Sequence, residues 1–271
     1  MEKTISIGLC TSGSRLIVAV EADGKIKSCC RKLFSQETAL FPAVKKLLPI
    51  GKKISDIGEV CALKGPGRFT GIRIGLTVAG TLNALSGAAV RTATVFEVLA
   101  FQASCSAAFA RSFPSGSKTA VLMNAFREEY FCAVYNIASP GALPELTDAP
   151  VWLQRPDMEK KLSGIKEPFF CIADEKEKPE IYSLLPKQAV RAPKKISCIL
   201  PEYLISAPRR FGSSDLKPLY LKPAKFELDA MEKAAKKAAA EKNAEAVSAK
   251  CAALIDNAEI KNSCVKKEPA R

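Results

Sequence analysis

The chain has 271 residues, 48% of them hydrophobic, which is enough for one large or two modest domains with a real core. It contains no histidine, which excludes histidine-based acid–base chemistry, the usual catalytic triads and imidazole metal sites. Its 41 basic and 28 acidic residues give a net charge of +13, which fits either an acidic partner such as RNA or simply a soluble, lysine-rich surface.

The N-terminal part of the sequence alternates between predicted strands and predicted helices. Residues 4–9 and 15–20 alternate apolar with other residues, which predicts two strands, and Asp23-Gly24 predicts a hairpin turn into a third strand at 25–32. The elements predicted next are a helix around 40–48, a strand at 60–63, a helix at 70–85, a strand at 88–91 and a helix that begins at Thr94. This β-β-β-α-β-α-β-α order is that of one actin-like ATPase half-domain and predicts an α/β class with a mixed sheet.

A segment rich in serine, proline and glycine at 112–117 separates a second region. A hairpin pair is predicted at 119–123 and 130–135, and beyond it the pattern is irregular and interrupted by prolines, which indicates a reduced subdomain. From Leu228 onward alanine, lysine and glutamate dominate, which predicts a solvated helical or disordered tail, or else a helix that docks on a partner. The predicted organisation is an N-terminal subdomain at 1–111, a reduced C-terminal subdomain at 118–225 and a tail at 226–271.

The cysteines are expected to be reduced and structural. Cys10, Cys61, Cys132 and Cys171 lie in apolar stretches that predict strands, where a thiol behaves as a small hydrophobe, and the chain contains no C-x-x-C pair. The first residues show no signal-peptide pattern, and no window approaches the ~20 apolar residues of a membrane span. We therefore expect a soluble, cytoplasmic protein without disulfides or a membrane segment.

The most informative segment is 64–76, KGPGRFTGIRIGL, which follows a predicted strand and leads into a predicted helix. Gly65 and Gly67 can adopt backbone angles closed to other residues, and Thr70 is a good N-cap. Free amides at the helix start, together with nearby basic side chains, could attract an anion, although the segment matches neither a Walker A loop nor the dinucleotide fingerprint. The candidate anion or nucleotide loop consists of Thr11, Gly65, Gly67, Arg68, Thr70 and Arg73.

Segment 64–76 resembles the signature of the TsaB family, with supporting matches at 5–12, 94–96 and 218–221. The resemblance spans roughly residues 3–225. It implies an actin-like ATPase, ribonuclease H-like fold and a non-catalytic subunit of the bacterial complex that installs threonylcarbamoyl groups on the tRNA adenosine beside the anticodon. It implies no cofactor, no catalytic residue and no metal site.

The sequence also departs from the family pattern at positions that would carry charge. The family's first strand ends in Asp-Thr, whereas this chain has Cys10-Thr11, and a second acidic position falls on Asn124. The family's histidine before the first helix is lost, with Gln36-Glu37 in that neighbourhood. A thiol and an amide cannot hold a metal–phosphate group as carboxylates do, so any residual nucleotide site is further eroded.

The resemblance further implies a set of partners. These are TsaD, a metal-dependent relative that carries out the transfer, TsaE, an ATPase in the larger assembly, and tRNA bound through the complex; a homodimer could form when the chain is alone. In the family, pairing uses the first two helices of each partner, packed as a four-helix bundle. The sequence offers a groove of small residues on the second helix, although these faces could simply pack on the chain's own sheet. The predicted interface consists of Leu40, Val44, Leu47, Gly71, Ile72, Gly75, Leu76 and Ala79.

Two other functions fit parts of the sequence. An ATP-dependent kinase, or a glycoprotease-like peptidase of the same superfamily, would need a metal-binding histidine pair or an acidic phosphate–metal site on the first strand, and the sequence has neither. A stand-alone RNA-binding protein is suggested by the net charge alone.

Overall fold

The computed structural model describes residues 5–33, 35–223 and 233, and all of them except Pro223 and Lys233 belong to a compact unit that ends at Lys222. The tail predicted at 226–271 lies outside the described residues, apart from Lys233. Within the described part, no helix is long and apolar enough to cross a membrane.

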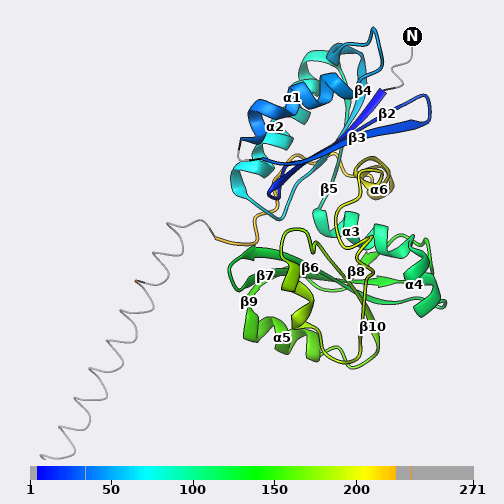
Figure 1. Cartoon of the computed structure of the whole chain (residues 1–271), viewed down its shortest axis with the longest axis vertical. Coiled ribbons are helices and arrows are strands. Elements are labelled where there is room, and N and C mark those ends of the chain that lie inside the picture. The colour runs from blue at the N-terminus through cyan, green and yellow to red at the C-terminus, as the bar shows by residue number, and fades with distance from the viewer. Residues whose placement is uncertain (1–4, 34, 224–232, 234–271) are drawn as a thin grey trace, which may run out of the picture. The chain divides into compact units, whose positions relative to one another are not determined.

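The N-terminal sheet has five strands in the order β3-β2-β1-β4-β5 (Figure 1). Its strands are β1 (Ile5–Cys10), β2 (Arg15–Ala22), β3 (Lys25–Lys32), β4 (Ile57–Leu63) and β5 (Ala89–Ala93). β1, β2 and β3 pair antiparallel, whereas β1, β4 and β5 run parallel. Asp23 and Gly24 both have positive φ, 51° and 71°, as a tight hairpin turn requires. β3 is the edge strand, and nearly all of its residues are exposed.

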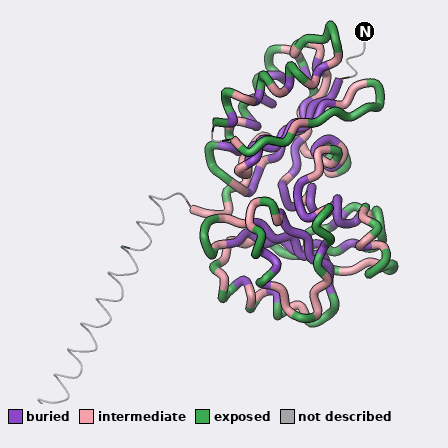
Figure 2. Tube along the Cα trace, viewed as in Figure 1, coloured by how far each residue is buried: buried purple, intermediate pink, exposed green. Residues whose placement is uncertain are grey.

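β1 and most of β2 are buried, as Figure 2 shows in purple. Because successive side chains of a strand point to opposite faces, both faces of the N-terminal sheet are covered. Ile7, Leu9 and Val18 pack under α1 (Gln36–Leu47) and α2 (Phe69–Ser86), which lie on one face. Ile17 and Ala19 point to the other face, together with residues of α3 (Val95–Ser104) and α6 (Tyr203–Phe211). Glycine at position 8 of β1 allows α6 to pack closely on the sheet, because a Cβ there would lie 2.6 Å from Leu204 Cβ.

The second sheet has the order β11-β10-β6-β7-β8, with β9 also paired to β7. Its strands are β6 (Ser117–Phe126), β7 (Glu129–Ile137), β8 (Glu145–Leu146), β9 (Val151–Gln154), β10 (Phe169–Ala173) and β11 (Ala189–Arg191). The predicted hairpin is the β6–β7 pair. One face packs on α3 and α4 (Ala107–Ser112), and the other on α5 (Arg155–Ser163) and the 3-10 helix η2 (Pro179–Leu184).

The predicted α/β class is therefore confirmed, with two mixed sheets and helices on their faces. The observed bounds of the first half lie close to those predicted: the strand predicted at 60–63 begins at Ile57, after the 3-10 helix η1 (Ile54–Asp56). The helix predicted at 70–85 spans Phe69–Ser86. The strand predicted at 88–91 is β5, which ends at Ala93.

The cysteines within the described residues are free thiols that differ in exposure. Cys10 and Cys132 are buried, and burial raises the pKa of Cys10 to about 11 and that of Cys132 to about 12. Cys30 and Cys105 are exposed. The buried thiols are thus both inaccessible and protonated at neutral pH.

We expect iodoacetamide at neutral pH to alkylate Cys30 and Cys105 in the folded protein while leaving Cys10 and Cys132 intact, because only a thiolate within reach of solvent reacts. Peptide mass spectrometry over a time course measures this, with the urea-unfolded chain as the control in which all four react. Equal rates for Cys10 and Cys30 in the folded protein would contradict the burial described above.

Candidate functional site

The glycine loop between β4 and α2 packs directly on the turn that joins β1 to β2. Gly65 and Gly67 have φ of 105° and 152°, in the region that favours glycine. A Cβ on Gly67 would lie 2.3 Å from the carbonyl oxygen of Ser12. The Arg68 amide donates a 2.7 Å hydrogen bond to that same oxygen. The loop therefore uses its glycines for close approach to the chain's own backbone.

The start of α2 differs from the prediction that Thr70 caps it. The helix begins at Phe69, Arg68 is the N-cap, and no side chain caps the helix. Thr70 is exposed within the first turn. The contact with Ser12 occupies the Arg68 amide, and Thr11, which is buried, donates its hydroxyl to the Gly71 carbonyl at 2.6 Å. The chain's own turn thus covers the inner side of the helix start, where the sequence predicts a candidate anion site.

Arg73, the remaining basic residue of the predicted loop, belongs to an aromatic cluster on the surface. Its guanidinium carbon lies 3.9 Å from the centre of the Phe69 ring, and its Nε donates to the Tyr220 hydroxyl at 3.0 Å. The Phe69 and Tyr220 rings stack with centroids 4.8 Å apart. The backbone of Leu219 donates to the Lys64 carbonyl at 2.7 Å. This cluster holds the segment around 218–221 against the glycine loop.

The small residues predicted to form a partner groove face the chain's own sheet, so this part of the prediction is corrected. A Cβ on Gly71 would lie 2.0 Å from the Thr11 carbonyl oxygen, and one on Gly75 would lie 2.6 Å from Thr11 Oγ1. Ala79 is completely buried. The other predicted interface residues in the same buried cluster are Leu40, Val44, Ile72 and Leu76, with Leu47 packed against it half-buried. One side of α2 has to cover the sheet, and the small residues lie on that side because the turn approaches so closely.

We expect Gly71→Ala to lower the free energy of unfolding by roughly 1–3 kcal/mol, because its Cβ would push the turn away from the helix. Gly80→Ala on the same helix is the matched control: its Cβ meets nothing nearer than Leu216 Cδ1 at 3.5 Å, so the change should stabilise by about 0.5–1 kcal/mol. Urea denaturation of both variants measures the difference. Equal stabilities would refute the close contact.

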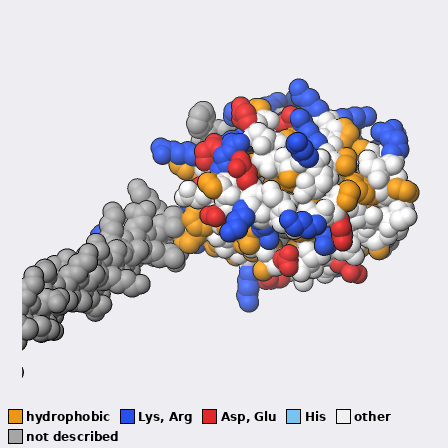
Figure 3. All heavy atoms as spheres, turned by 90° about the horizontal axis from the view of Figure 1, so that it is seen from below, with side chains coloured by type: hydrophobic (Ala, Val, Ile, Leu, Met, Phe, Trp, Pro, Cys, Tyr) orange, Lys and Arg blue, Asp and Glu red, His pale blue; other side chains and the backbone are white. Residues whose placement is uncertain are grey.

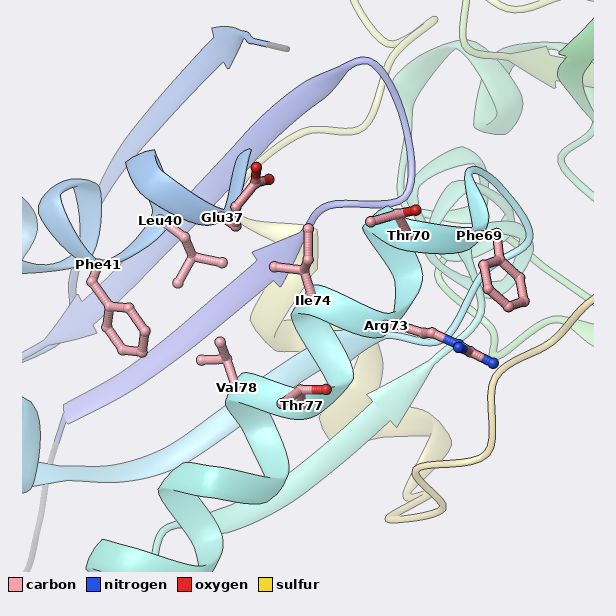
Figure 4. A pocket seen from close by; sticks show the side chains of 9 residues that line it. All are labelled: Glu37, Leu40, Phe41, Phe69, Thr70, Arg73, Ile74, Thr77 and Val78. Carbon is pink, nitrogen blue, oxygen red and sulfur yellow. The ribbon is translucent and has the colours of Figure 1, made fainter. Parts of the chain in front are cut away.

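The outer sides of α1 and α2 form a groove of about 410 Å³ that the sequence reading did not identify (Figure 4). Phe41, Ile74 and Val78 project into the space between the two helices, while Phe69 and Arg73 lie together at one end. Phe41 is 39% exposed and Phe69 49% exposed. The full lining is Glu37, Leu40, Phe41, Phe69, Thr70, Arg73, Ile74, Thr77 and Val78. The signal in the sequence was the i, i+4 spacing of two rows along α2, Phe69-Arg73-Thr77 and Thr70-Ile74-Val78.

β1 ends in Cys10, a neutral, protonated thiol, at a position where the resembled TsaB family has an acidic group. Cys10 Sγ lies 3.4 Å from Ser12 Oγ, and both residues are buried. Asn124, at the second such position on β6, has an amide oxygen that is buried without a hydrogen-bond partner among the described residues. These positions supply no negative charge with which to hold a metal ion.

No family model matches this chain, and no curated protein matches it in sequence. Among solved structures, it is similar to an uncharacterized protein from Pseudomonas aeruginosa with similarity to the peptidase YeaZ, at 21% identity and a TM-score of 0.59, covering 81% of this chain and all of that one. It is also similar to YeaZ from Pseudomonas aeruginosa, at 20% identity and a TM-score of 0.58, covering 80% of this chain and all of that one. The chain thus has the fold of these YeaZ structures, with the predicted α/β class and mixed sheet.

Proposed function

We propose that this chain is a non-catalytic subunit of the tRNA threonylcarbamoyladenosine transferase complex and that it pairs with TsaD through the outer sides of α1 and α2. The observation that carries the proposal is the exposed apolar groove between these two helices. They are the helices through which the TsaB family, which segment 64–76 resembles, forms its four-helix bundle. The YeaZ-like fold supports the same reading.

The chemistry of the groove suits a pair of partner helices. Leu40 and Val78 form a buried apolar floor, and the half-exposed rings of Phe41 and Phe69 stand at its sides. Aromatic residues at the centre of an interface contribute much of its binding energy. Glu37 and Arg73 add one charge of each sign to the lining, which can set the register of a partner.

The alternative, an ATP-dependent kinase or a peptidase, has weaker support. The name of one structural neighbour mentions a peptidase, yet this chain contains no histidine, which excludes a peptidase site with a histidine base. At the end of β1, burial raises the pKa of Cys10 to about 11, so this thiol is protonated at neutral pH and is a poor nucleophile.

Phe41→Glu is expected to weaken the complex with TsaD at least roughly 30-fold, because it places a charge in the apolar groove. Leu85→Glu is the matched control: Leu85 is an 82% exposed apolar residue on α2 outside the groove, and its change should leave the affinity unaltered. Titration of labelled variants with purified TsaD gives both dissociation constants. Equal losses for the two variants would reject the groove as the interface.

Reconstitution tests the function itself. TsaD, TsaE, tRNA and the threonylcarbamoyl adenylate should modify tRNA only when this chain is added, and Phe41→Glu should fail to support the reaction. Turnover of Mg-ATP by the isolated chain, or full activity in its absence, would favour the enzyme reading instead.

We also propose that basic side chains at the β3–α1 edge help the complex hold tRNA. One face of the molecule shows basic side chains interspersed with acidic ones (Figure 3). The edge around β3 and α1 differs, because a groove of about 480 Å³ between them is lined by Arg31 and Lys46 and by no acidic residue. The exposed basic residues on β3 and α1 are Lys25, Lys27, Arg31, Lys32, Lys45 and Lys46, and the exposed Lys52 and Lys53 follow in the loop after α1. Within the described part of the chain, the ion pairs all involve other basic residues.

Reversal of four of these lysines, Lys45, Lys46, Lys52 and Lys53, to glutamate should weaken tRNA binding by the assembled complex and flatten its dependence on salt, because fewer counterions are then released. A control variant with the same change in charge reverses Lys166, Lys187, Lys194 and Lys195, which are exposed around the second sheet. Filter binding at several salt concentrations compares the two. Equal weakening would mean that net charge, and not this edge, attracts the tRNA.

A further inference from the structure

The groove of about 480 Å³ between β3 and α1 has walls that phosphate contacts alone do not require. Its described lining consists mostly of aliphatic side chains, with two basic side chains and no acidic one. Leu16 of β2, which is completely buried, lies at its base. This β3–α1 groove therefore combines an apolar interior with positive charge.

The groove is open because β3 carries no large apolar side chain on the face that α1 covers. Leu16 and Val18 of β2 are completely buried on that face. Their cross-strand neighbours on β3 are Arg31 and Cys29, which point to the same face. Arg31 is exposed and Cys29 is half-buried, so the apolar core ends at β2 and leaves space above β3.

α1 contributes small residues to the opposite wall. Ala39 and Ala43 lie one turn apart and Lys46 follows in the next turn, so all three share one side of the helix. The larger side chains of Leu40 and Val44 are directed into the buried core instead. The two alanines keep the space beside β3 open, and Lys46 adds an exposed ammonium group to the lining.

The charge of the β3–α1 groove is unbalanced. Arg31 and Lys46 are both exposed, and among the residues that the structure describes neither forms an ion pair with a carboxylate. The groove between α1 and α2 differs, because Glu37 accompanies Arg73 in its lining. Aliphatic walls favour an alkyl chain, and two cations without an acid favour an anionic head group.

We propose that the β3–α1 groove binds a small anionic amphiphile, a single alkyl chain that ends in a carboxylate or a similar oxyanion. The alkyl chain lies over Leu16 between α1 and β3, and the head group pairs with Arg31 and Lys46. The volume of about 480 Å³ falls within the ~300–1,000 Å³ of small-molecule pockets. The site goes beyond the scaffold function and requires neither TsaD nor tRNA.

Titration calorimetry of the wild type with three decyl compounds tests the chemistry of the ligand. Decanoate should bind more tightly than decanol, and decyltrimethylammonium should bind most weakly, because only the anion pairs with Arg31 and Lys46. Octanoate should bind roughly 4- to 15-fold more weakly than decanoate, because two fewer CH₂ groups are buried. Equal affinities for the three head groups, or no binding of decanoate, would overturn the proposal.

Variants in charge locate the head group. Arg31→Gln combined with Lys46→Gln should weaken decanoate binding at least roughly tenfold. Lys32→Gln combined with Lys45→Gln is the matched control, because it removes the same charge from exposed neighbours outside the lining and should leave the affinity unchanged. Equal losses for the two pairs would mean that net charge, and not the groove, attracts the anion.

Variants in volume locate the alkyl chain. Ala43→Leu should abolish decanoate binding because it fills the β3–α1 groove, whereas Thr77→Leu narrows the groove between α1 and α2 and should leave binding intact. The reverse pattern would place the chain in the other groove and overturn the proposal. If Ala43→Leu does not fold, the exposed charge variants decide the question.

Flotation with phosphatidylglycerol vesicles distinguishes a free amphiphile from a membrane surface. At physiological salt the protein should not float with the vesicles, because the groove accommodates one separate alkyl chain. Flotation without binding of free decanoate would overturn the proposal, since the basic edge would then recognise an anionic membrane. None of these measurements contains TsaD or tRNA, so their outcome does not depend on the proposed scaffold function.

Discussion

The carbonyl oxygens of Thr11 and Ser12 lie where side chains on Gly71 and Gly67 would have to be, so the turn after β1 and the first turn of α2 meet backbone to backbone. In this contact the Arg68 amide donates its hydrogen bond to the turn, and the turn covers the inner side of the helix start. It also turns the opposite side of α2 outward, where Phe69, Ile74 and Thr77 border the groove beside α1. The same rigid turn holds the Ser14 donors that receive Glu177. One close approach thus places both the outer groove and the turn that receives Glu177.

Much of the N-terminal sheet could be predicted, because its signals are local: alternation in β1 and β2, the Asp23-Gly24 turn and the glycine loop each act within a few residues. The second half resisted prediction because its elements are short and contain prolines, as α5 and α6 do. The site was predicted only in part. The glycine spacing indicates that another part of the structure packs closely on α2, but it does not identify that part. Here it is Thr11 of the same chain. No local sequence pattern around Glu177 predicts its contact with Ser14, which lies 163 residues away in the chain.

The side chains at the end of β1 and the start of α2 support the proposal of a binding role. Positions where the resembled family carries acids hold Cys10, whose thiol is buried and protonated, and the neutral Asn124. Arg73 is committed to Phe69 and Tyr220, which ties the segment around 218–221 to the start of α2. These side chains are therefore neutral or engaged with one another, while apolar side chains line a groove between α1 and α2.

The exposed edge strand β3 also affects how copies of this chain interact with one another. Its outer backbone is unpaired within the described part of the sheet, which makes it a template on which a strand of another molecule could add and start aggregation. Lys25, Lys27, Arg31 and Lys32 place like charges along this strand, so a second copy that approached edge to edge would be repelled. The basic edge therefore also protects the protein from self-association through its sheets.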